Sequence, residues 1–387
     1  MFKILTLNNI SPRGLSQFEA DQYQVGSDLT EPDAILVRSQ VMHDMAFPES
    51  VKAVGRAGAG VNNIPITRLS ALGVPVFNTP GANANAVKEL VLVGLLMASR
   101  NIPQALHFVE GLDGDDAAMH KTVEAGKKQF VGTELPGRTL GVVGLGAIGV
   151  KVANAAHALG MRVIGFDPKV TVENAWQLSA GVEQARSVEE VIARADYLSF
   201  HVPLNDHTRD MLNAERLKLA KPSLVVLNFS REGVVGAALV REALDSGRIA
   251  GYVCDFPSVS LKGHSRVIAL PHLGASTQEA EENCAVMVVQ QVRDYLENGN
   301  IRNSVNFPEA ILPRTEGFRV CIVNANVPNM LGQISSTLAG SGLNILDMLN
   351  KSKGDLAYTV VDVDRAIPEA ATAGLRAIEG VLAVRAL

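Results

Sequence analysis

Two polar residues that follow apolar runs have the side chains needed to move a proton and to hold an acid. His272 comes directly after VIALP, and Arg231 comes directly after LVVLNFS. An imidazole can take or give a proton near neutral pH, and a guanidinium binds a carboxylate through two parallel hydrogen bonds. This combination suits the oxidation of a 2-hydroxy acid, in which the arginine holds the carboxylate and the histidine takes the hydroxyl proton. We therefore predict Arg231 and His272 as a catalytic pair.

A glycine-rich turn predicts a dinucleotide site. The strand-like run at 139–143 leads directly into GLGAIG (144–149), and a helical pattern follows. In this context the first glycine permits the tight turn, the second lets the backbone approach a pyrophosphate, and the third lets the helix pack on the strand. The helix N-terminus offers N–H groups to the phosphates. Asp167 closes the next strand, where its carboxylate would bind ribose hydroxyls and repel a 2′-phosphate, so the sequence favours NAD over NADP.

The composition bounds the class of protein. The chain has 387 residues, of which 47% are hydrophobic and 19% charged, with a formal net charge of −5. These values indicate two or three globular domains and argue against nucleic acid or an anionic membrane as the main partner. The cysteines Cys254, Cys284 and Cys321 are scattered without a CxxC motif, so we expect no disulfide framework, no metal site and a reducing, cytoplasmic location. The N-terminus lacks a signal-peptide pattern, and the longest apolar run, 90–98, is too short to cross a bilayer.

Short β-rich runs alternate with helical patterns along most of the chain, which predicts parallel sheets built from βαβ units. The first series has predicted strands at 34–39, 51–60 and 74–81, followed by a long helix over 84–99. The second series has six predicted strands, at 139–146, 162–168, 196–203, 223–230, 249–256 and 267–274. Six such runs make a complete doubly wound sheet.

The C-terminal third predicts a returning helix, a linker and a small module. Ser276 and Glu279 form an S-x-x-E capping box, so we expect a helix from Ser276 to about Asn298 that packs back on the first domain. Two prolines mark a linker, after which the order βαββαβ is that of a ferredoxin-like module. The predicted divisions are a discontinuous first domain (1–98 and 281–307), a dinucleotide-binding domain (99–280), the linker (308–316) and the module (317–387).

Several stretches together resemble the D-isomer-specific 2-hydroxyacid dehydrogenases, and among them the D-3-phosphoglycerate dehydrogenases with a C-terminal ACT domain. The matching stretches are RAGAGVNNI (56–64), NTPGANANAVKEL (78–90), GLGAIG (144–149), HVPL (201–204), NFSREGVV (228–235) and PHLGASTQEAEEN (271–283). The resemblance implies an α/β protein with a flavodoxin-like substrate domain, a Rossmann NAD domain and a ferredoxin-like ACT domain. It also implies NAD-dependent oxidation of 3-phospho-D-glycerate to 3-phosphohydroxypyruvate, the first step of L-serine biosynthesis.

The resemblance carries over to individual positions. It implies that Arg231 binds the substrate carboxylate and that His272 is the acid–base. The positions matching the family's cofactor contacts are Gly144, Gly146, Ala147, Ile148, Gly149, Asp167, His201, Pro203, Phe229, Ser230, Asp255 and Gly274. The positions matching its substrate contacts are Arg38, Ser39, Arg56, Gly60 and Asn62. Because Arg38 and Arg56 end predicted first-domain strands, we also expect them to face the cofactor.

One position departs from the family pattern. The family has a glutamate between the arginine and the histidine that hydrogen-bonds the imidazole. Here Asp255-Phe256-Pro257-Ser258 is followed by Val259 and Ser260, so the expected glutamate position is occupied by Val259 or Ser260. Ser260 could accept a hydrogen bond from His272 but would give no charge stabilisation. We expect a slower enzyme or a shifted pH optimum, because acid–base catalysis is worth about 10²–10⁴-fold and an orienting acid supplies part of it.

An ACT domain implies amino-acid sensing, usually of L-serine, at an interface between paired modules and therefore a homodimer or homotetramer. The matching effector positions are Asn324, Asn326 and Asn344, although Asn324 replaces the family's histidine and Asn329 its glycine. A module that serves dimerisation alone is the alternative. Two other functions stay open: a reductase for hydroxypyruvate or 2-oxoglutarate, and a catalytically weakened sensor of NAD and amino acids.

Overall fold

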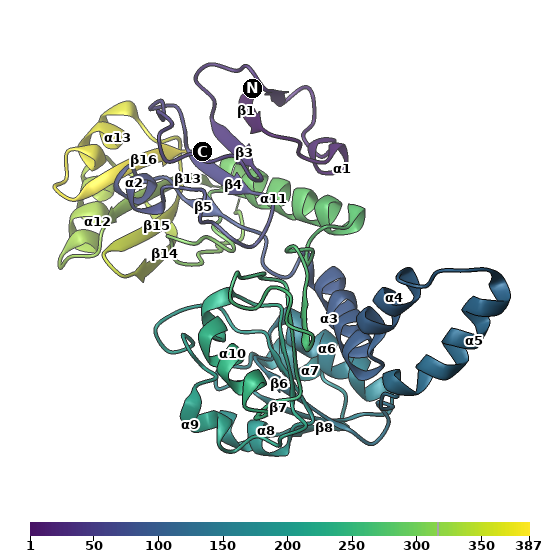
Figure 1. Cartoon of the computed structure of the whole chain (residues 1–387). Helices are drawn as coiled ribbons and strands as arrows, with labels where there is room; N and C mark the ends of the chain where they lie inside the picture. The colour runs from purple at the N-terminus through teal and green to yellow at the C-terminus, as the bar shows by residue number, and fades with distance from the viewer. Residues whose placement is uncertain (316) are drawn as a thin grey trace. The chain divides into compact units, whose positions relative to one another are not determined.

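The computed structural model describes residues 1–315 and 317–387 (Figure 1). Residue contacts divide the described chain into two compact units. Unit 1 combines Met1–Asn83 with Gln278–Leu387, and unit 2 is Ala84–Thr277. No helix in the described ranges combines the length and the apolar character that crossing a membrane requires.

The first sheet of unit 1 is parallel throughout, with the strand order β2-β1-β3-β4-β5. Its strands are β1 (Phe2–Leu7), β2 (Tyr23–Gly26), β3 (Ala34–Val37), β4 (Ala53–Arg56) and β5 (Val76–Phe77). The short helices α1 (Pro12–Leu15) and α2 (Ile66–Ala71) lie in its connections. The three predicted strands are present as β3, β4 and β5, and β1 and β2 join them. This order is the flavodoxin-like form of the doubly wound sheet.

The long helix α11 (Gln278–Asn298) fills the core of unit 1. Its residues Ala285, Val288 and Val292 pack in one apolar cluster with Leu36 and Phe77. The helix ends where predicted but begins at Gln278, so the prediction of a helix start and capping box at Ser276 is wrong. The backbone N–H of Ser276 donates to Leu273 O at 2.9 Å, which places Ser276 in the turn before the helix.

The sheet of unit 2 is also parallel throughout and has seven strands in the order β12-β11-β10-β9-β6-β7-β8. The strands are β6 (Thr139–Val143), β7 (Arg162–Phe166), β8 (Val182–Gln184), β9 (Tyr197–Phe200), β10 (Val225–Asn228), β11 (Gly251–Cys254) and β12 (Val267–Ala269). All six predicted strands are present, but the prediction that six complete the sheet is wrong. The additional strand β8 is short and mostly exposed, so it lacks the apolar run that marks the others.

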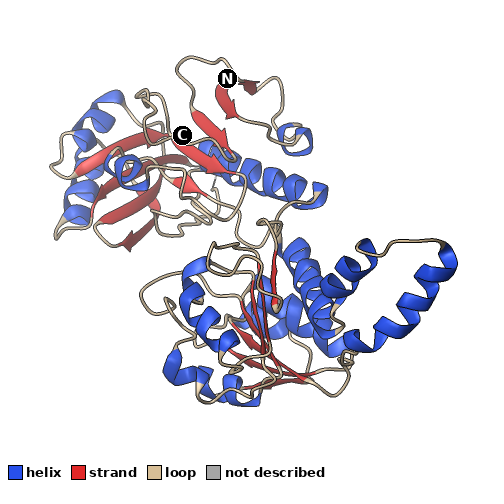
Figure 2. Cartoon of the chain, in the orientation of Figure 1, coloured by secondary structure: helices blue, strands red, loops and turns tan. Residues whose placement is uncertain are grey.

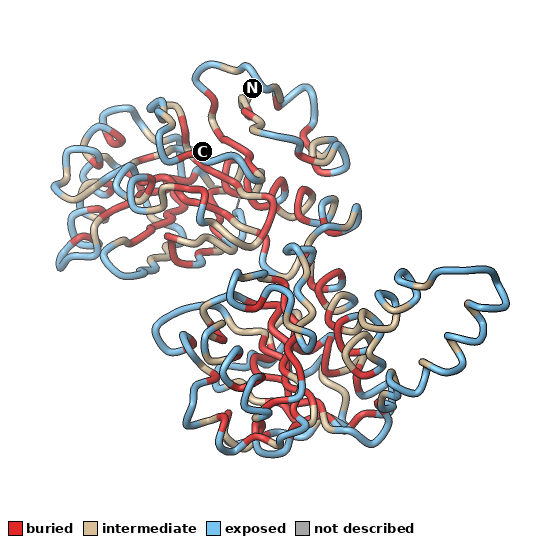
Figure 3. The backbone as a smooth tube through the Cα atoms, in the orientation of Figure 1, coloured by how far each residue is buried: buried red, intermediate tan, exposed pale blue. Residues whose placement is uncertain are grey.

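Helices cover both faces of this sheet, as Figure 2 shows. On one face α3 (Ala84–Ser99) and α6 (Ala147–Ala158) share a core with strand residues such as Val142 and Val253. On the other face α8 (Val188–Arg194), α9 (Ala214–Leu217) and α10 (Ala237–Asp245) pack in a second core. The remaining helices of the unit are α4 (Ile102–Glu110), α5 (Asp116–Gly126), η1 (Lys127–Phe130), α7 (Val172–Gln177) and η2 (Glu232–Val234). Figure 3 shows the buried strands and the exposed α5, which contains no buried residue.

The C-terminal module has an antiparallel sheet in the order β14-β15-β13-β16. Its elements are β13 (Phe318–Ala325), α12 (Met330–Gly340), β14 (Ile345–Lys353), β15 (Leu356–Val363), α13 (Glu369–Arg376) and β16 (Val381–Ala386). The predicted ferredoxin-like βαββαβ order is therefore confirmed. The last residue of the predicted linker, Glu316, lies outside the described residues.

Candidate active site

The predicted site residues of unit 2 lie at one edge of the seven-stranded sheet. The strands are parallel, so their carboxyl ends meet at that edge, where ligands of open α/β sheets bind. Gly144 follows β6, Asp167 follows β7 and His201 follows β9. The loop of Arg231 follows β10, Asp255 follows β11, and His272 comes three residues after β12. The fold therefore gathers side chains that are far apart in the sequence.

The glycine-rich turn lies at the point where the strand order reverses, between β6 and β9. A side chain at Gly144, whose φ is +93°, would place its Cβ 2.6 Å from His201 O. A Cβ at Gly149 would lie 1.9 Å from Gly144 O, whereas a Cβ at Gly146 would meet nothing within 4 Å. Gly144 and Gly149 are thus required by the fold itself. The open space at Gly146 fits the close approach of a pyrophosphate.

Asp167 ties the glycine turn to the end of β7. Its Oδ2 accepts from Leu145 N at 2.9 Å and its Oδ1 accepts from Lys169 N at 2.8 Å. Each carboxylate oxygen keeps acceptor capacity beyond one hydrogen bond. The carboxylate is therefore held in place and is still able to accept from ribose hydroxyls, so these residues fit NAD.

Arg231 is an exposed residue at the end of a loop that Asn228 organises. The fully buried Asn228 accepts at Oδ1 from Ser230 N (3.2 Å) and Ser230 Oγ (2.9 Å), and donates from Nδ2 to Arg231 O at 3.0 Å. Arg231 Nη1 donates to Ser230 O at 2.6 Å. The side chain of Phe229 lies in the core, since a Cβ at Gly94 would meet its ring at 3.1 Å. Phe229, one of the predicted cofactor contacts, can therefore contact NAD only through its backbone.

His272 lies on a turn that Asp255 holds. The carboxylate of Asp255 is 2% exposed and accepts from Leu273 N at 2.7 Å and from Gly274 N at 2.9 Å. His272 itself has a left-handed backbone with φ of 57°, a conformation uncommon for a residue with a side chain. The Asp255 clamp keeps the turn in this conformation and so fixes where the imidazole projects.

The imidazole of His272 has no acidic partner among the described residues. Its nearest aromatic neighbour is Phe256, whose ring centroid is 5.2 Å away in an edge-on arrangement. Val259 is 94% exposed, and the hydroxyl of Ser260 lies 3.2 Å from that of Ser258. The structure gives no hydrogen bond from His272 to Ser260, so the serine does not replace the family glutamate in this conformation.

His201 provides a half-buried, neutral imidazole at the switch point. Its Nε2 lies 2.9 Å from Ser199 Oγ, and its Nδ1 is buried without a hydrogen-bond partner. Burial lowers the pKa of His201 to about 4. The ring is therefore uncharged at neutral pH. Pro203, which follows in the same loop, is exposed.

In unit 1 the predicted substrate residues form a group around the ends of β3 and β4. Arg56 Nε donates to Arg38 O at 3.0 Å, and a Cβ at Gly58 would lie 1.8 Å from Arg56 Nη1, so the guanidinium rests on the glycine. Arg38 Nη2 forms an ion pair with Glu281 Oε1 of α11 at 2.6 Å. The side chains of Arg38 and Glu281 are 35% and 43% exposed. Arg38 thus already holds an anionic group.

Two residues of this group, Asn8 and Asn63, were not predicted as substrate contacts. Asn8 Oδ1 accepts from Ser39 N at 3.2 Å, and the buried Asn63 donates from Nδ2 to Gln40 O at 2.8 Å. Gly60 and Asn62 lie in the neighbouring loop, where Asn62 O is 3.0 Å from His43 Nε2. Asn63, and not the exposed Asn62, therefore organises the backbone here. In the sequence, the pair Asn62–Asn63 indicated a polar loop here, but it did not show which of the two asparagines is buried.

The predicted effector residues differ in their surroundings. Asn324 is 1% exposed, donates from Nδ2 to Ala325 O at 2.7 Å and accepts from Thr359 Oγ1 at 3.4 Å. Asn326 and Asn344 are exposed, and Asn326 Nδ2 donates to Gly354 O at 3.0 Å. The amide of Asn324 is thus engaged inside the module. In the described part of the chain, no group of three or more His, Cys, Asp or Glu side chains could hold a metal ion.

The strand order, the glycine turn and the position of Arg231 and His272 at one edge of the sheet together define a class of protein. Comparison with known proteins identifies this class. The chain belongs to the D-isomer-specific 2-hydroxyacid dehydrogenase family. Residues 94–274 match the family model described as "D-isomer specific 2-hydroxyacid dehydrogenase, NAD binding domain", so the cofactor is NAD.

Relatives within that family include D-3-phosphoglycerate dehydrogenases. The one from Haemophilus influenzae is 33% identical over 348 residues, covering 87% of this chain and 81% of the relative. The one from Methanocaldococcus jannaschii is 33% identical over 347 residues, and the chain spans 62% of that relative's length. A solved structure, the NAD⁺-bound 3-phosphoglycerate dehydrogenase of Entamoeba histolytica, has a TM-score of 0.59 and 23% identity, and covers 79% of this chain and 98% of that one. At that identity the structure supports the fold alone.

Proposed function

We propose that the protein oxidises 3-phospho-D-glycerate to 3-phosphohydroxypyruvate with NAD, the entry step of L-serine biosynthesis. The observation that carries the proposal is the convergence of Arg231, His272 and the glycine turn on one edge of the unit 2 sheet. The similarity to D-3-phosphoglycerate dehydrogenases over 87% of the chain supports the choice of substrate.

Each unit 2 residue has a role that its position allows. The guanidinium of Arg231 binds the substrate carboxylate and polarises the adjacent C2 oxygen. His272 takes the C2 hydroxyl proton in oxidation and returns it in reduction. NAD, when bound, accepts the hydride from C2. Asp167 binds the adenosine ribose, while the loops of Ala147–Ile148, His201–Pro203 and Phe229–Ser230 and the turn of Asp255 and Gly274 surround the remainder of the cofactor.

Unit 1 supplies the residues proposed to bind the phosphate. Arg38 and Arg56 carry the positive charge, and Ser39, Gly60 and Asn62 contribute nearby polar and backbone groups. The support is the contact between Arg56 Nε and Arg38 O, which keeps the two arginines together. Glu281 Oε1 lies 2.6 Å from Arg38 Nη2, which indicates that this guanidinium can bind an anionic group.

The domain organisation extends the proposal. We propose a substrate domain at 1–98 and 281–307, an NAD domain at 99–280, a linker at 308–316 and a regulatory ACT domain at 317–387. Residues 84–98 of the proposed substrate domain form α3, which packs on the sheet of unit 2. L-Serine is the candidate effector, bound through Asn326 and Asn344 between paired modules of a homodimer or homotetramer. The engaged amide of Asn324 supports a smaller role for that residue. A cytoplasmic location fits the three cysteines, which are free and buried.

The test is to follow NADH absorbance with 3-phosphohydroxypyruvate in the wild type and in His272→Ala and Arg231→Gln. We expect turnover that falls by about 10²–10⁴-fold in His272→Ala and a strongly raised KM in Arg231→Gln. Turnover that is independent of His272, or no turnover together with intact NAD binding, would favour the sensor. Unchanged activity in Arg38→Ala with phosphorylated substrate would favour a reductase for hydroxypyruvate or 2-oxoglutarate.

A further inference from the structure

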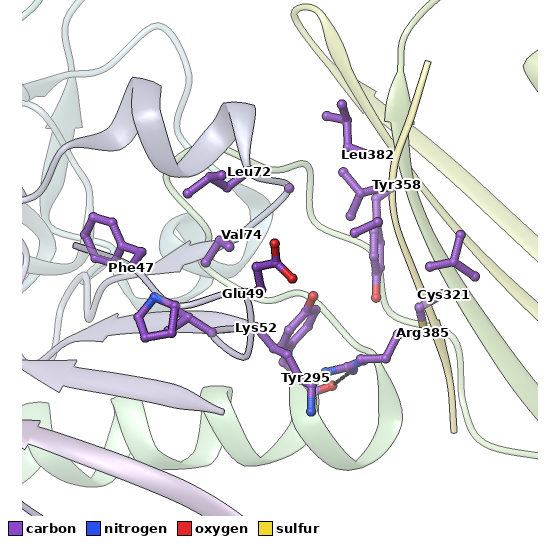
Figure 4. A pocket seen from close by; sticks show the side chains of 16 residues that line it. Phe47, Glu49, Lys52, Leu72, Val74, Tyr295, Cys321, Tyr358, Leu382 and Arg385 are labelled. Atoms are coloured by element: carbon purple, nitrogen blue, oxygen red, sulfur yellow. Dashed lines mark hydrogen bonds between the residues drawn. The ribbon is translucent and has the colours of Figure 1, made fainter. Parts of the chain in front are cut away.

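A pocket of about 340 Å³ lies within unit 1, between the first sheet and the C-terminal module. Its walls come from residues 47–52, from the turn between α2 and β5, from α11 and from the module's sheet. At about 30 Å³ per liquid water, the volume equals roughly eleven waters, which is enough for a small organic molecule. Figure 4 shows Arg385 beside Tyr295, with Leu72 and Val74 on one side of the pocket and Leu382 on the other.

The guanidinium of Arg385 lines this pocket and is only partly satisfied. Its Nη2 donates to Tyr295 O, and its Cζ lies 4.2 Å from the centroid of the Tyr295 ring. Its Nε and Nη1 are buried and have no hydrogen-bond partner. No carboxylate in residues 1–315 or 317–387 forms an ion pair with it, although ion pairs hold many other arginines of the chain.

This arrangement leaves a buried charge short of acceptors. Arginine keeps its proton in proteins, so the group cannot become neutral. A stacked aromatic ring returns about 0.5–2 kcal/mol, whereas a buried donor without an acceptor costs about 1–3 kcal/mol, and more when it is charged. An acceptor delivered through the pocket would remove that cost. Since Nε and Nη1 are shielded from solvent, a small rotation of the side chain accompanies such contact.

The remaining lining limits the ligand's charge and polarity. Most of the wall is apolar, including Val74, Val323 and Leu382. Lys52 is engaged, because its Nζ lies 2.5 Å from Asp33 Oδ1. The exposed Glu49 has no ion-pair partner in the described ranges, and its negative charge would repel a second anionic group on a ligand.

We propose that this pocket binds a small monocarboxylate with an apolar body. The carboxylate takes the free N–H groups of Arg385, and the hydrocarbon part lies against Val74, Val323 and Leu382. Phosphorylated compounds and dicarboxylates are excluded by Glu49. The site is independent of the proposed function, because Arg231 and His272 belong to unit 2. Occupancy would join strand β16 of the module to the α2–β5 turn and so stabilise unit 1.

The test is calorimetric titration of the full chain with 4-methylpentanoate, with 4-methylpentanamide and adipate as matched controls. We expect a dissociation constant on the order of 0.1–1 mM for the monocarboxylate, a raised Tm, and at least about tenfold weaker binding of both controls. Arg385→Met should weaken binding at least about tenfold. Leu382→Trp, which fills the pocket at an exposed position and leaves the arginine in place, should abolish binding even if Arg385→Met fails to fold.

Two further variants distinguish this pocket from the carboxylate-binding site of unit 2 and from an internal ion pair. Arg231→Gln should bind the monocarboxylate as tightly as the wild type, because Arg231 belongs to unit 2 and does not line this pocket. Glu49→Gln should keep monocarboxylate binding and admit adipate. The proposal is overturned if 10 mM 4-methylpentanoate neither binds nor raises Tm, if Leu382→Trp binds normally, or if binding is lost in Arg231→Gln. It is also overturned if Glu49→Gln destabilises the ligand-free protein as Arg385→Met does, since Glu49 would then be the counter-ion.

Discussion

At the scale of single residues, the candidate site depends on carboxylates and amides that hold backbone. Asp255 uses both oxygens on Leu273 N and Gly274 N, and Asn228 fixes the loop of Arg231. Neither side chain touches the imidazole or the guanidinium that would do the chemistry. Their positions determine where those groups project, and a displacement of about 1 Å at a reacting group can cost about 10²-fold in rate.

Asp255→Asn tests this positioning role. The amide nitrogen of asparagine would face a backbone N–H in place of a carboxylate oxygen, which strands one donor in a site that is 2% exposed. We expect kcat to fall by about 10²-fold and the free energy of unfolding to fall by about 1–3 kcal/mol, with the KM for substrate nearly unchanged. Steady-state kinetics and urea unfolding measure both. Asp206→Asn, in an exposed loop of the same unit, is the control and should change neither quantity.

The ion pair between Arg38 and Glu281 leads to a prediction about substrate charge. Glu281 competes with a substrate phosphate for Arg38 and also repels it. Glu281→Gln should lower the KM for 3-phosphohydroxypyruvate about two- to fivefold, consistent with the roughly 0–1 kcal/mol of an exposed pair, and should leave the KM for hydroxypyruvate unchanged. The matched control is Glu282→Gln, which breaks the 2.6 Å pair with Arg13 and should affect neither KM. Equal effects of both variants would contradict the prediction.

The lowered pKa of His201 predicts that the protein loses stability at acidic pH. Its folded-state pKa of about 4 lies below the ordinary value of 6.5, so the unfolded chain binds its proton more readily between these two pH values. The free energy of unfolding should therefore fall as pH decreases from about 6.5 to about 4, by roughly 3 kcal/mol from this residue, and the effect should stop growing below pH 4. Urea unfolding at several pH values of the wild type and His201→Gln measures it. The variant should lose that part of the slope, whereas His207→Gln at an exposed position should keep it.

At the scale of elements, the carboxyl edge of one parallel sheet brings the chemistry together. Each functional loop begins where a buried strand ends, and β6 and β9 separate at the glycine turn. The helix α6 begins directly after Gly146, so its free N–H groups face the turn.

Alanine substitutions at two glycines of this turn should impair the protein for different reasons. In Gly149→Ala the new Cβ would lie 1.9 Å from Gly144 O, so the ligand-free protein should lose several kcal/mol of stability or fail to fold. In Gly146→Ala the new Cβ meets nothing within 4 Å and φ is −75°, so the ligand-free stability should be unchanged. NAD affinity should nevertheless fall at least about tenfold, because the methyl group occupies the approach of the pyrophosphate. Thermal unfolding without NAD and titration with NAD distinguish the two effects, and normal NAD binding by Gly146→Ala would mean that the pyrophosphate does not approach this glycine.

The helices and strands differ in how well they could be predicted from the sequence. Buried parallel strands are continuous apolar runs, so β9, β10 and β11 were readily predicted, whereas β8 has no such run. Helix α11 begins two residues later than predicted. The capping pattern at Ser276 does not reveal that the N–H of Ser276 donates to Leu273 O in a turn before the helix. The roles of Asp255, Asn228 and Asn63 come from hydrogen bonds that depend on the folded loops. Residue types alone indicated that these residues are polar and close to the site, but not which groups they hold.

At the scale of the whole molecule, unit 1 is one core that extends from the first sheet into the C-terminal module. Leu36, Leu296 and Phe307 belong to the same apolar cluster as Val323 and Tyr358 of the module. A buried ion pair at the same junction joins Arg319 to Asp362, with Nε–Oδ1 at 2.6 Å and Nη2–Oδ2 at 2.8 Å. Arg319 also donates to Asn298 O, Leu312 O and Pro313 O. The guanidinium thereby connects the end of α11, the linker and the module.

Removing one charge of this pair should therefore loosen the module as well as destabilise it. In Asp362→Asn the fully buried guanidinium of Arg319 loses its counter-ion, and breaking a buried pair in this way costs about 3–5 kcal/mol. Urea unfolding should show that loss, and limited proteolysis should cut faster within the predicted linker, residues 308–316. Arg365→Gln, which breaks the exposed pair with Asp364, should change stability by less than about 1 kcal/mol and leave the cleavage rate unchanged. If Asp362→Asn lost stability without faster cleavage in the linker, the pair would stabilise the module alone and would not hold it to the first sheet.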